Sequence, residues 1–372
     1  MKRSFFCVYL RGGEILTGNR LLVLLGSPRS KGNTAALLSC FLSSYPGEYR
    51  IVDAYSSQIK ACIDCRYCWK NSGCSLRDDM DLVYEELLRC NQLLIATPIY
   101  FAQPTAPLMT VFSRLQTYFA SNRFRQEESQ LPYKKAGVLL TGGGSGGKRA
   151  TLRTIDMVLE HINAFRVGEA SSLKTDHLLA SQDKTAFEQI DHLLQQMLSP
   201  YFMESDRLGF STWKPEDFSK AMELWGNSQV TKWIHRKGVM SLQEIQDRFE
   251  MEQQNQRDHH VQYWPVYLKA NHEFIGCCGL RPYPSSQGTL EIGAHFLPSA
   301  WGHGYAKEAS EQVMEYCRRR RLAKSLFAGH HPQNTNSGKV LEKLGFTYTG
   351  DEYYPPTGLM HPSYLFRWEK ED

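Results

Sequence analysis

An apolar run and the small-residue loop behind it decide the fold of the first half of the chain: Leu21-Leu22-Val23-Leu24-Leu25, then Gly26-Ser27-Pro28-Arg29-Ser30-Lys31-Gly32-Asn33-Thr34. A short, continuous apolar run that stops at a glycine is typical of a buried parallel strand. A helical pattern begins at Thr34, so glycine amides, hydroxyls and a helix N-terminus come together and can bind an anion. A phosphate site and a simple capped helix are both compatible with this loop.

The composition of the loop indicates which phosphate it would bind. It lacks the Gly-Lys-Ser/Thr ending of a P-loop and the glycine triplet of a dinucleotide-binding fold. Hydroxyl side chains in place of glycines fit a terminal monophosphate better than a pyrophosphate pressed against the backbone. The residues that we expect to bind this phosphate are Ser27, Arg29, Ser30, Gly32, Asn33 and Thr34.

Strand and helix patterns alternate through the first half of the chain. Further strands are predicted at residues 48–54, 92–97 and 135–141. Helices are predicted at 34–43, 79–90, 105–120, 151–164 and 183–198. Such alternation indicates an α/β fold with a doubly wound parallel sheet.

Two more loops follow the third and fourth predicted strands, one aromatic and one rich in glycine. In a flavodoxin-like sheet of order 2-1-3-4-5, the ends of strands one, three and four meet at the switch point where FMN sits. One loop can then hold the phosphate while the other two flank a flat ring. The expected ring contacts are Pro98, Ile99, Tyr100, Phe101, Thr141, Gly142 and Gly143.

The motifs GSPRSKGNT and TPIYFAQPTAPL resemble those of the NADPH-dependent FMN reductase and iron-sulfur flavoprotein family, over about residues 20–198. The resemblance implies bound FMN, reduction by NAD(P)H, and a homodimer or homotetramer with the flavin near a subunit interface. The run from Gly142 to Lys148 begins like a nucleotide-phosphate motif, but Arg149 stands where magnesium binding needs Ser or Thr. We interpret it as a flexible glycine loop near the flavin.

Four closely spaced cysteines, Cys62, Cys65, Cys68 and Cys74, can wrap a 4Fe–4S cluster or, less naturally, a zinc ion. Their spacing resembles the compact cluster motif of iron-sulfur flavoproteins. The alternative is a loop of reduced thiols near the flavin or at a subunit contact. With a cluster, single electrons would pass between FMN and a redox partner; without one, FMN would serve a small-molecule electron acceptor.

The second half of the chain has a mixed α+β pattern that begins with a strand-like stretch at 207–213. Further strands are predicted at 263–269, 273–281 and 289–296, and a helix at 304–319. Between the last strand and that helix lies a glycine-spaced turn, which can present backbone amides to a pyrophosphate. This turn, with Asn334, Ser337 and the run Val340 to Phe346, resembles the GNAT acetyltransferases over about residues 204–370, especially the ribosomal-protein N-acetyltransferase branch.

The GNAT resemblance implies direct acetyl transfer from acetyl-CoA to an amine, which is a protein N-terminus or a small molecule. By that resemblance, Ser337 would protonate the departing thiolate and Glu291 would act as the base, with His295 as an alternative base. Ser299 stands where the family commonly has Arg or Gln, which predicts weakened acetyl-CoA binding. The residues expected to bind acetyl-CoA are Phe296, Trp301, Gly302, His303, Gly304, Tyr305, Ala306 and Asn334.

Composition places outer bounds on these predictions. The 372 residues, 42% apolar and 22% charged, fit two globular domains, and a net charge of +4 gives no support to a nucleic-acid partner. No secretory signal or membrane span is recognisable. Five of the ten cysteines cluster between Cys62 and Cys90, which argues against a secreted framework, so we expect a cytoplasmic protein. The expected domains are an N-terminal extension (1–19), a flavodoxin-like reductase (20–199) and a GNAT domain (204–372).

Three other interpretations remain open at this stage. In the first, an iron-sulfur flavoprotein module transfers electrons or senses redox state, with an acetyltransferase attached. In the second, the sheet binds NAD, with Asp53 contacting a ribose, and retains no flavin. In the third, the GNAT fold has degenerated through Ser299 and only binds its ligand.

Overall fold

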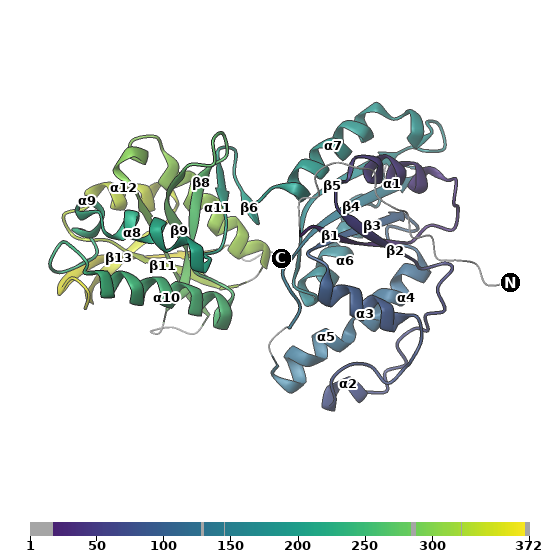
Figure 1. Cartoon of the computed structure of the whole chain (residues 1–372), viewed down its shortest axis with the longest axis horizontal. Helices are drawn as coiled ribbons and strands as arrows, with labels where there is room; N and C mark the ends of the chain where they lie inside the picture. Colours follow the sequence, from purple (N-terminus) through teal and green to yellow (C-terminus); the bar gives the residue numbers. More distant parts are fainter. Residues whose placement is uncertain (1–17, 128–129, 145, 284–287, 321, 369–372) are drawn as a thin grey trace. The chain divides into compact units, whose positions relative to one another are not determined.

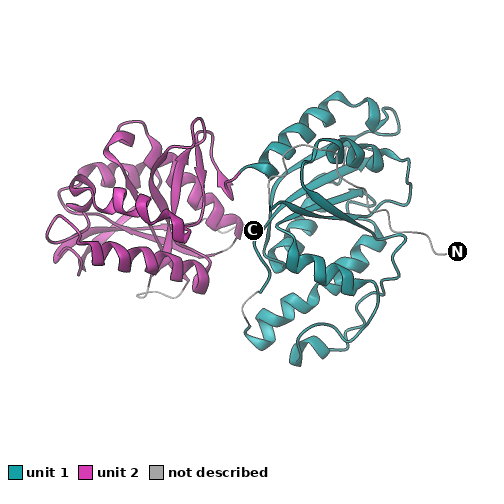
Figure 2. Ribbon diagram, viewed as in Figure 1, with its two compact units in different colours: residues 1–199 teal, residues 200–372 magenta. Residues whose placement is uncertain are grey.

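The computed structural model describes residues 18–127, 130–144, 146–283, 288–320 and 322–368. The chain divides into two compact units, residues 1–199 and 200–372 (Figure 2). The predicted N-terminal extension lies, up to residue 17, outside the described residues.

The first unit contains a parallel sheet with the strand order β2-β1-β3-β4-β5 (Figure 1). The predicted doubly wound, flavodoxin-like order is therefore confirmed. The strands are β1 (Arg20–Leu25), β2 (Glu48–Asp53), β3 (Gln92–Pro98), β4 (Lys134–Gly142) and β5 (Ala164–Leu173). The helices are α1 (Asn33–Ser44), α2 (Tyr67–Lys70), α3 (Met80–Arg89), α4 (Ala106–Arg114), α5 (Gln116–Ala120), α6 (Lys148–His161) and α7 (Lys184–Leu198).

Alternate residues of β1 pack into two separate cores, because successive side chains of a strand point to opposite faces. Leu21 and Val23 pack with α1 and α7, whereas Leu22 and Leu24 pack with α3, α4 and α6. Figure 1 shows these two groups of helices on opposite faces of the sheet. Burial on both faces explains why β1 reads as an unbroken apolar run.

The second unit contains an eight-stranded sheet with the order β12-β13-β11-β10-β9-β8-β7-β6. Its strands are β6 (Met203–Glu204), β7 (Leu208–Phe210), β8 (Tyr263–Leu268), β9 (Phe274–Pro282), β10 (Thr289–Phe296), β11 (Ser325–Gly329), β12 (Thr347–Tyr354) and β13 (Leu359–Arg367). Its helices are α8 (Phe218–Trp225), α9 (Ser228–Thr231), α10 (Leu242–His259), α11 (Tyr305–Arg320) and α12 (Thr335–Lys343).

Strands β10 and β11 run parallel but pair over three residues only, from Thr289 with Ser325 to Glu291 with Phe327. Beyond Glu291, β10 continues to Phe296 bonded to β9 on its other side. The sheet therefore splays open between β10 and β11, and Glu291 lies where the two strands separate.

Helices cover both faces of this second sheet. One core joins α11 to Trp264 and Cys278, and another joins α8 and α10 to Tyr263 and Cys277. The neighbouring cysteines of β9 thus lie in different cores. Both thiols are fully buried, as is Cys317 on α11, and burial raises the pKa of Cys278 and of Cys317 to about 12.

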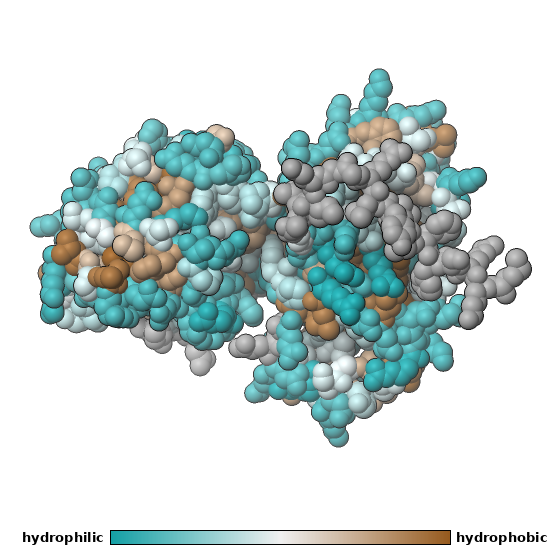
Figure 3. All heavy atoms as spheres, in the orientation of Figure 1, coloured by the Kyte–Doolittle hydropathy of each residue, from teal (hydrophilic) through white to brown (hydrophobic). Residues whose placement is uncertain are grey.

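The surface of both units is largely hydrophilic on the face drawn in Figure 3, with hydrophobic residues in small groups. Within the described parts of the chain, each helix is too short or too polar to cross a lipid bilayer.

Candidate functional site

The loop from Gly26 to Gly32 leaves the end of β1 and enters α1. Both backbone groups of its first residue are hydrogen-bonded. Gly26 N donates to Ala96 O at 2.8 Å, and Gly26 O accepts from Thr105 Oγ1 at 2.9 Å. A Cβ atom at Gly26 would lie 2.9 Å from side-chain atoms of Leu108 and Thr105, so only glycine fits. Ser27 is buried next to it, whereas Arg29 and Ser30 are exposed.

Helix α1 begins without a side-chain cap, because its N-cap residue is Gly32. The amides of its first turn therefore lack the side-chain acceptor that usually satisfies them, as an anion site requires. Thr34 Oγ1 lies 2.8 Å from Thr141 Oγ1, a buried bond that joins the start of α1 to the end of β4. Asn33 Oδ1 instead accepts from Ala180 N at 3.0 Å, so this side chain also anchors the loop.

A tight turn at Tyr100–Gln103 follows β3. Two backbone hydrogen bonds, of 2.9 and 3.0 Å, link Tyr100 and Gln103 in both directions. Phe101 and Ala102 have φ values of 50° and 61°. Left-handed conformations cost residues other than glycine about 1–2 kcal/mol each, and such strain gathers at ligand sites. The Phe101 side chain is fully exposed, while Pro98 is buried and Ile99 partly buried.

The glycine loop after β4 packs against this turn. Gly147 has φ +85°, and a Cβ atom there would lie 2.9 Å from Ala102 Cα. Ile99 N donates to Thr141 O at 2.8 Å, and Thr175 N donates to Gly142 O at 2.9 Å. The phosphate loop, the aromatic turn and the glycine loop therefore meet at one edge of the sheet, as the sequence predicts for the ring and phosphate residues.

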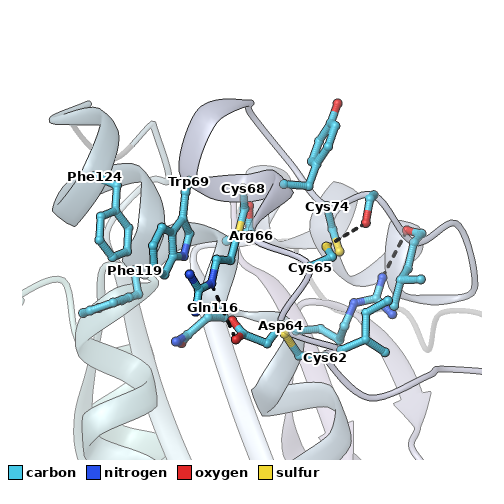
Figure 4. A pocket seen from close by; sticks show the side chains of 16 residues that line it. Cys62, Asp64, Cys65, Arg66, Cys68, Trp69, Cys74, Gln116, Phe119 and Phe124 are labelled. Carbon is cyan, nitrogen blue, oxygen red and sulfur yellow. Dashed lines mark hydrogen bonds and ion pairs between the residues drawn. The ribbon is translucent and has the colours of Figure 1, made fainter.

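The four cysteines line one pocket together with Trp69, Phe119 and Phe124 (Figure 4). All four are free thiols, and Cys65 Sγ lies 3.1 Å from Ser75 Oγ. In the described part of the chain, no group of three or more metal-ligating side chains is already placed to hold an ion. The four sulfurs share a pocket without forming a closed coordination shell.

Arg114 fixes the cysteine loop, a role that sequence reasoning missed. Its side chain is buried and donates to Lys60 O at 2.9 Å and to Leu76 O at 3.1 Å, which bracket the four cysteines. It also forms an ion pair of 2.7 Å with Asp78. Burial is the largest single effect on the pKa of Asp78 and would raise it, but the hydrogen bonds from Arg114, Lys60 N and Met80 N, together with the charge of Arg114, lower that pKa overall. Arg125 holds the middle of the loop by donating to Cys68 O.

In the second unit, all the predicted acetyl-CoA residues except Asn334 lie between the end of β10 and the first turn of α11. Trp301 Nε1 donates to Phe296 O at 2.8 Å. Gly302 and Gly304 have φ values of +82° and +79°, a region that favours glycine. The rings of His303 and Tyr305 stack with centroids 5.4 Å apart. The turn that enters α11 therefore contains two positions that favour glycine.

Asn334 and Ser337 lie together at the start of α12. The Asn334 side chain caps the helix by accepting from Ser337 N at 3.4 Å, a role preferred by asparagine. The Ser337 side chain is partly buried. The local geometry thus gives Asn334 a structural role in addition to the cofactor contact predicted from the sequence.

The two candidate bases have different surroundings. Glu291 Oε1 accepts from Tyr263 Oη at 2.8 Å, at the point where the sheet splays. His295 packs against Tyr263, and its Nδ1 accepts from Trp225 Nε1 at 3.3 Å. Burial lowers the pKa of His295 well below its usual value, so this ring is neutral near pH 7. The Nδ1 lone pair of this neutral ring is thus already occupied by the hydrogen bond from Trp225 Nε1.

Two family models match the chain. Residues 19–177 match the model for NADPH-dependent FMN reductase, and residues 207–347 match the model for the acetyltransferase (GNAT) domain. The chain joins an FMN reductase domain to a GNAT domain. These matches support the FMN, NAD(P)H and acetyl-CoA predicted from the sequence, and both domains belong to families of enzymes.

Relatives match one domain or the other. The FMN reductase domain is 32% identical over 135 residues to an iron-sulfur flavoprotein of Methanocaldococcus jannaschii, covering 35% of this chain and 65% of the relative. The GNAT domain is 25% identical over 170 residues to the uncharacterized N-acetyltransferase p20 of Bacillus licheniformis, covering 45% of this chain and 96% of the relative. A GNAT-family acetyltransferase structure from Bacillus anthracis matches with 23% identity and a TM-score of 0.38, covering 44% of this chain and 95% of that one.

Proposed function

We propose that the chain is a bifunctional enzyme, an FMN-dependent NAD(P)H oxidoreductase fused to an acetyl-CoA-dependent N-acetyltransferase. The observation that carries the first half is the bond between Thr34 and Thr141, which ties the uncapped start of α1 to the end of β4. This bond supports an anion site at the switch point of a flavodoxin-like sheet, where the loops after β3 and β4 would flank the ring. The flavin supplies the redox chemistry when it is bound.

The chain's own residues would position the flavin. The phosphate would be bound by Ser27, Arg29, Ser30, Gly32 and Thr34. The side-chain NH2 group of Asn33 would also contact it, since Asn33 Oδ1 already accepts from Ala180 N. Pro98, Ile99, Tyr100, Phe101, Thr141, Gly142 and Gly143 would border the ring. The exposed Phe101 side chain would shield the site from water on the side of the strained turn.

A cluster in the cysteine pocket is the finer proposal for this domain. The donor set fits, because four free thiols lie in one pocket and thiolates are the ligands of 4Fe–4S clusters. Cys62, Cys65, Cys68 and Cys74 would hold the cluster, with Arg114 and Arg125 fixing their loop. The cluster would exchange single electrons with a redox partner. Relatives named iron-sulfur flavoproteins support this proposal, which favours an electron-transfer module as the second candidate function.

In the GNAT domain, the proposed reaction forms an N–C bond to the acetyl carbon and breaks the C–S bond of acetyl-CoA. The amine loses one proton, which Glu291 accepts directly or through water, and the thiolate gains one from Ser337. The turn from Trp301 to Ala306 would bind the pyrophosphate through its backbone amides. The products are an acetylated amine and free coenzyme A.

We further propose domain limits of 20–199 and 204–372, a homodimer or homotetramer, and a cytoplasmic location. The limits are supported by the hydrophobic cores, because one large core contains residues of the first unit only and another contains residues of the second unit only. The flavin-site turn with its exposed Phe101 supports a subunit contact near the flavin. Neither a nucleic acid nor a membrane is among the proposed partners.

The proposed function predicts a flavin spectrum in anaerobically purified full-length protein. We expect about one FMN per chain, bleaching of the flavin bands by NADPH or NADH, and acetyl-CoA binding by titration calorimetry. About four irons per chain would support the cluster and the electron-transfer candidate. Flavin without iron would leave a simple reductase. Protein that binds no FMN after reconstitution would contradict the first activity, and protein that binds no acetyl-CoA would contradict the second.

A further inference from the structure

A polar group lies on the sheet face that α8 and α10 cover in the GNAT domain. Glu252 of α10 is fully buried, accepts from Tyr263 N at 2.8 Å, and forms an ion pair with Arg281 of β9. The Arg281 guanidinium also lies 4.0 Å from the centre of the Tyr263 ring. Glu252 and Arg281 thus neutralise each other in the interior.

Two further charges of opposite sign lie beside this buried pair. Arg248 precedes Glu252 by one helical turn, and its guanidinium lies 5.0 Å from the centre of the Trp225 ring. Within the described residues, Arg248 has no carboxylate within 4.0 Å, and its buried Nε atom has no hydrogen-bond partner. Glu291 accepts a hydrogen bond from Tyr263 Oη. Among the residues that the structure describes, no cationic group lies within 4.0 Å of Glu291.

Both charges act on Tyr354, at the end of β12. Burial and the charge of Glu291 raise the pKa of Tyr354, whereas Arg248, by its charge and by a hydrogen bond to Tyr354, and the charge of Arg281 lower it. Arg248, Glu291 and Tyr354 are all partly exposed, unlike the fully buried Glu252. The partly exposed side chains of Arg248 and Glu291 thus place a cation and an anion near Tyr354.

We propose that the acceptor of the GNAT domain is a compact amine that carries a carboxylate, such as a free amino acid. Its carboxylate binds Arg248, and its amine lies at Glu291, where the sheet splays. The proposal rests on the proposed acetyltransferase activity and names the substrate class. No carboxylate of the described residues lies within 4.0 Å of the Arg248 guanidinium, and the carboxylate of the ligand would supply a direct partner for it. Arginine is also the side chain best matched to a carboxylate.

The charge of the acceptor favours a free amino acid over a protein N-terminus. A free amino acid carries a carboxylate next to its amine, whereas at a protein N-terminus a neutral peptide bond takes that place. Only the free amino acid can therefore offer both charges at this short spacing.

The test compares free amino acids with their carboxamides, which keep the amine and lose only the negative charge. We expect the full-length protein to acetylate the acids with a kcat/KM about 10- to 100-fold above that of the carboxamides. In Arg248→Gln, the ratio of kcat/KM for the acids to kcat/KM for the carboxamides should fall to about one. Arg248→Lys should restore part of the preference. Arg257→Gln, at an exposed arginine on the same helix, is the matched control.

A second measurement guards against a variant that merely misfolds. In the presence of coenzyme A, amino acids should raise the melting temperature of the wild-type protein more than their carboxamides do, and Arg248→Gln should abolish the difference. Equal use of acids and carboxamides, preferential acetylation of peptide N-termini, or a preference unchanged in Arg248→Gln would overturn the inference. Failure to bind acetyl-CoA at all would instead contradict the proposed acetyltransferase activity.

Discussion

Replacing Arg114 with alanine is expected to lower the free energy of unfolding of the first unit by about 3–5 kcal/mol, because a buried ion pair would lose one partner. The Arg114 side chain has no exposed surface, and that of Asp78 is 7% exposed. The substitution leaves the Asp78 carboxylate buried without its cation. It also removes the donors to Lys60 O and Leu76 O, which hold both ends of the cysteine loop.

Urea unfolding curves of wild type and Arg114→Ala measure this effect. Limited proteolysis should in addition show earlier cleavage between residues 60 and 76. Arg77→Ala is the matched control, since Arg77 pairs with Asp81 on the surface, where an ion pair contributes about 0–1 kcal/mol. A loss in Arg114→Ala no larger than in Arg77→Ala would show that the buried pair does not stabilise the unit.

The same ion pair makes the first unit sensitive to acid. The pKa of Asp78 is lower in the folded protein than its ordinary value of 3.8, so the folded state binds this proton less readily than the unfolded state does. The corresponding stability is present above the ordinary pKa and is lost as pH falls through the lower, folded pKa. Unfolding curves from pH 5 downward should therefore converge for wild type and Arg114→Ala. Curves that stay parallel would contradict this linkage.

Substituting Glu291 with glutamine is expected to lower kcat for acetyl transfer by about 10²- to 10⁴-fold, the usual contribution of a general base. Glutamine keeps the shape and can still accept from Tyr263 Oη, so the fold and acetyl-CoA binding should be preserved. The expected result is thus a loss in kcat with an unchanged dissociation constant for acetyl-CoA.

Steady-state acetylation and calorimetric titration separate these two quantities. Glu250→Gln, at an exposed glutamate of α10, provides the control and should keep wild-type activity. If Glu291→Gln retained full kcat, the base would have to be another group, and His295 would be the next to test. A parallel loss of acetyl-CoA binding would instead indicate a structural role for Glu291.

The sequence predicts the first sheet well where its strands are buried on both faces. β1, β3 and β4 read as apolar runs, and the loops behind them hold the candidate flavin residues. The pattern does not mark β5, Ala-Phe-Arg-Val-Gly-Glu-Ala-Ser-Ser-Leu, because this edge strand is mostly half-buried and mixes polar with apolar residues. The predicted helix at 105–120 is divided into α4 and α5 at Leu115.

Elements with few buried residues were also missed. Helix α10 spans Leu242–His259 but buries only Ile245, Phe249 and Glu252, so its apolar periodicity is weak. The hairpin of β12 and β13 is largely exposed along β12 and lacks a clear strand signal. Both elements contribute to the polar group around Tyr354, which explains why that group could not be predicted.

Single charged residues carry the least information in a sequence. Arg114 ends a helix, where a cation is common in any case. Arg248 and Glu252 look like ordinary surface residues of a polar helix. Only the packing of α10 against α8 and β9 shows that Glu252 is fully buried and that, among the described residues, no carboxylate lies within 4.0 Å of Arg248.

Because Cys277, Cys278 and Cys317 are buried, the rate at which they react reports how often the core of the second unit opens. A thiol reacts with an alkylating reagent as the exposed thiolate, and these three groups are shielded from solvent with raised pKa values. Cys62 and Cys65 of the first unit are exposed and, in protein without a cluster, react without any opening. The slow labelling of the three buried thiols, read by mass spectrometry, therefore times the opening of the acetyltransferase core in the intact chain.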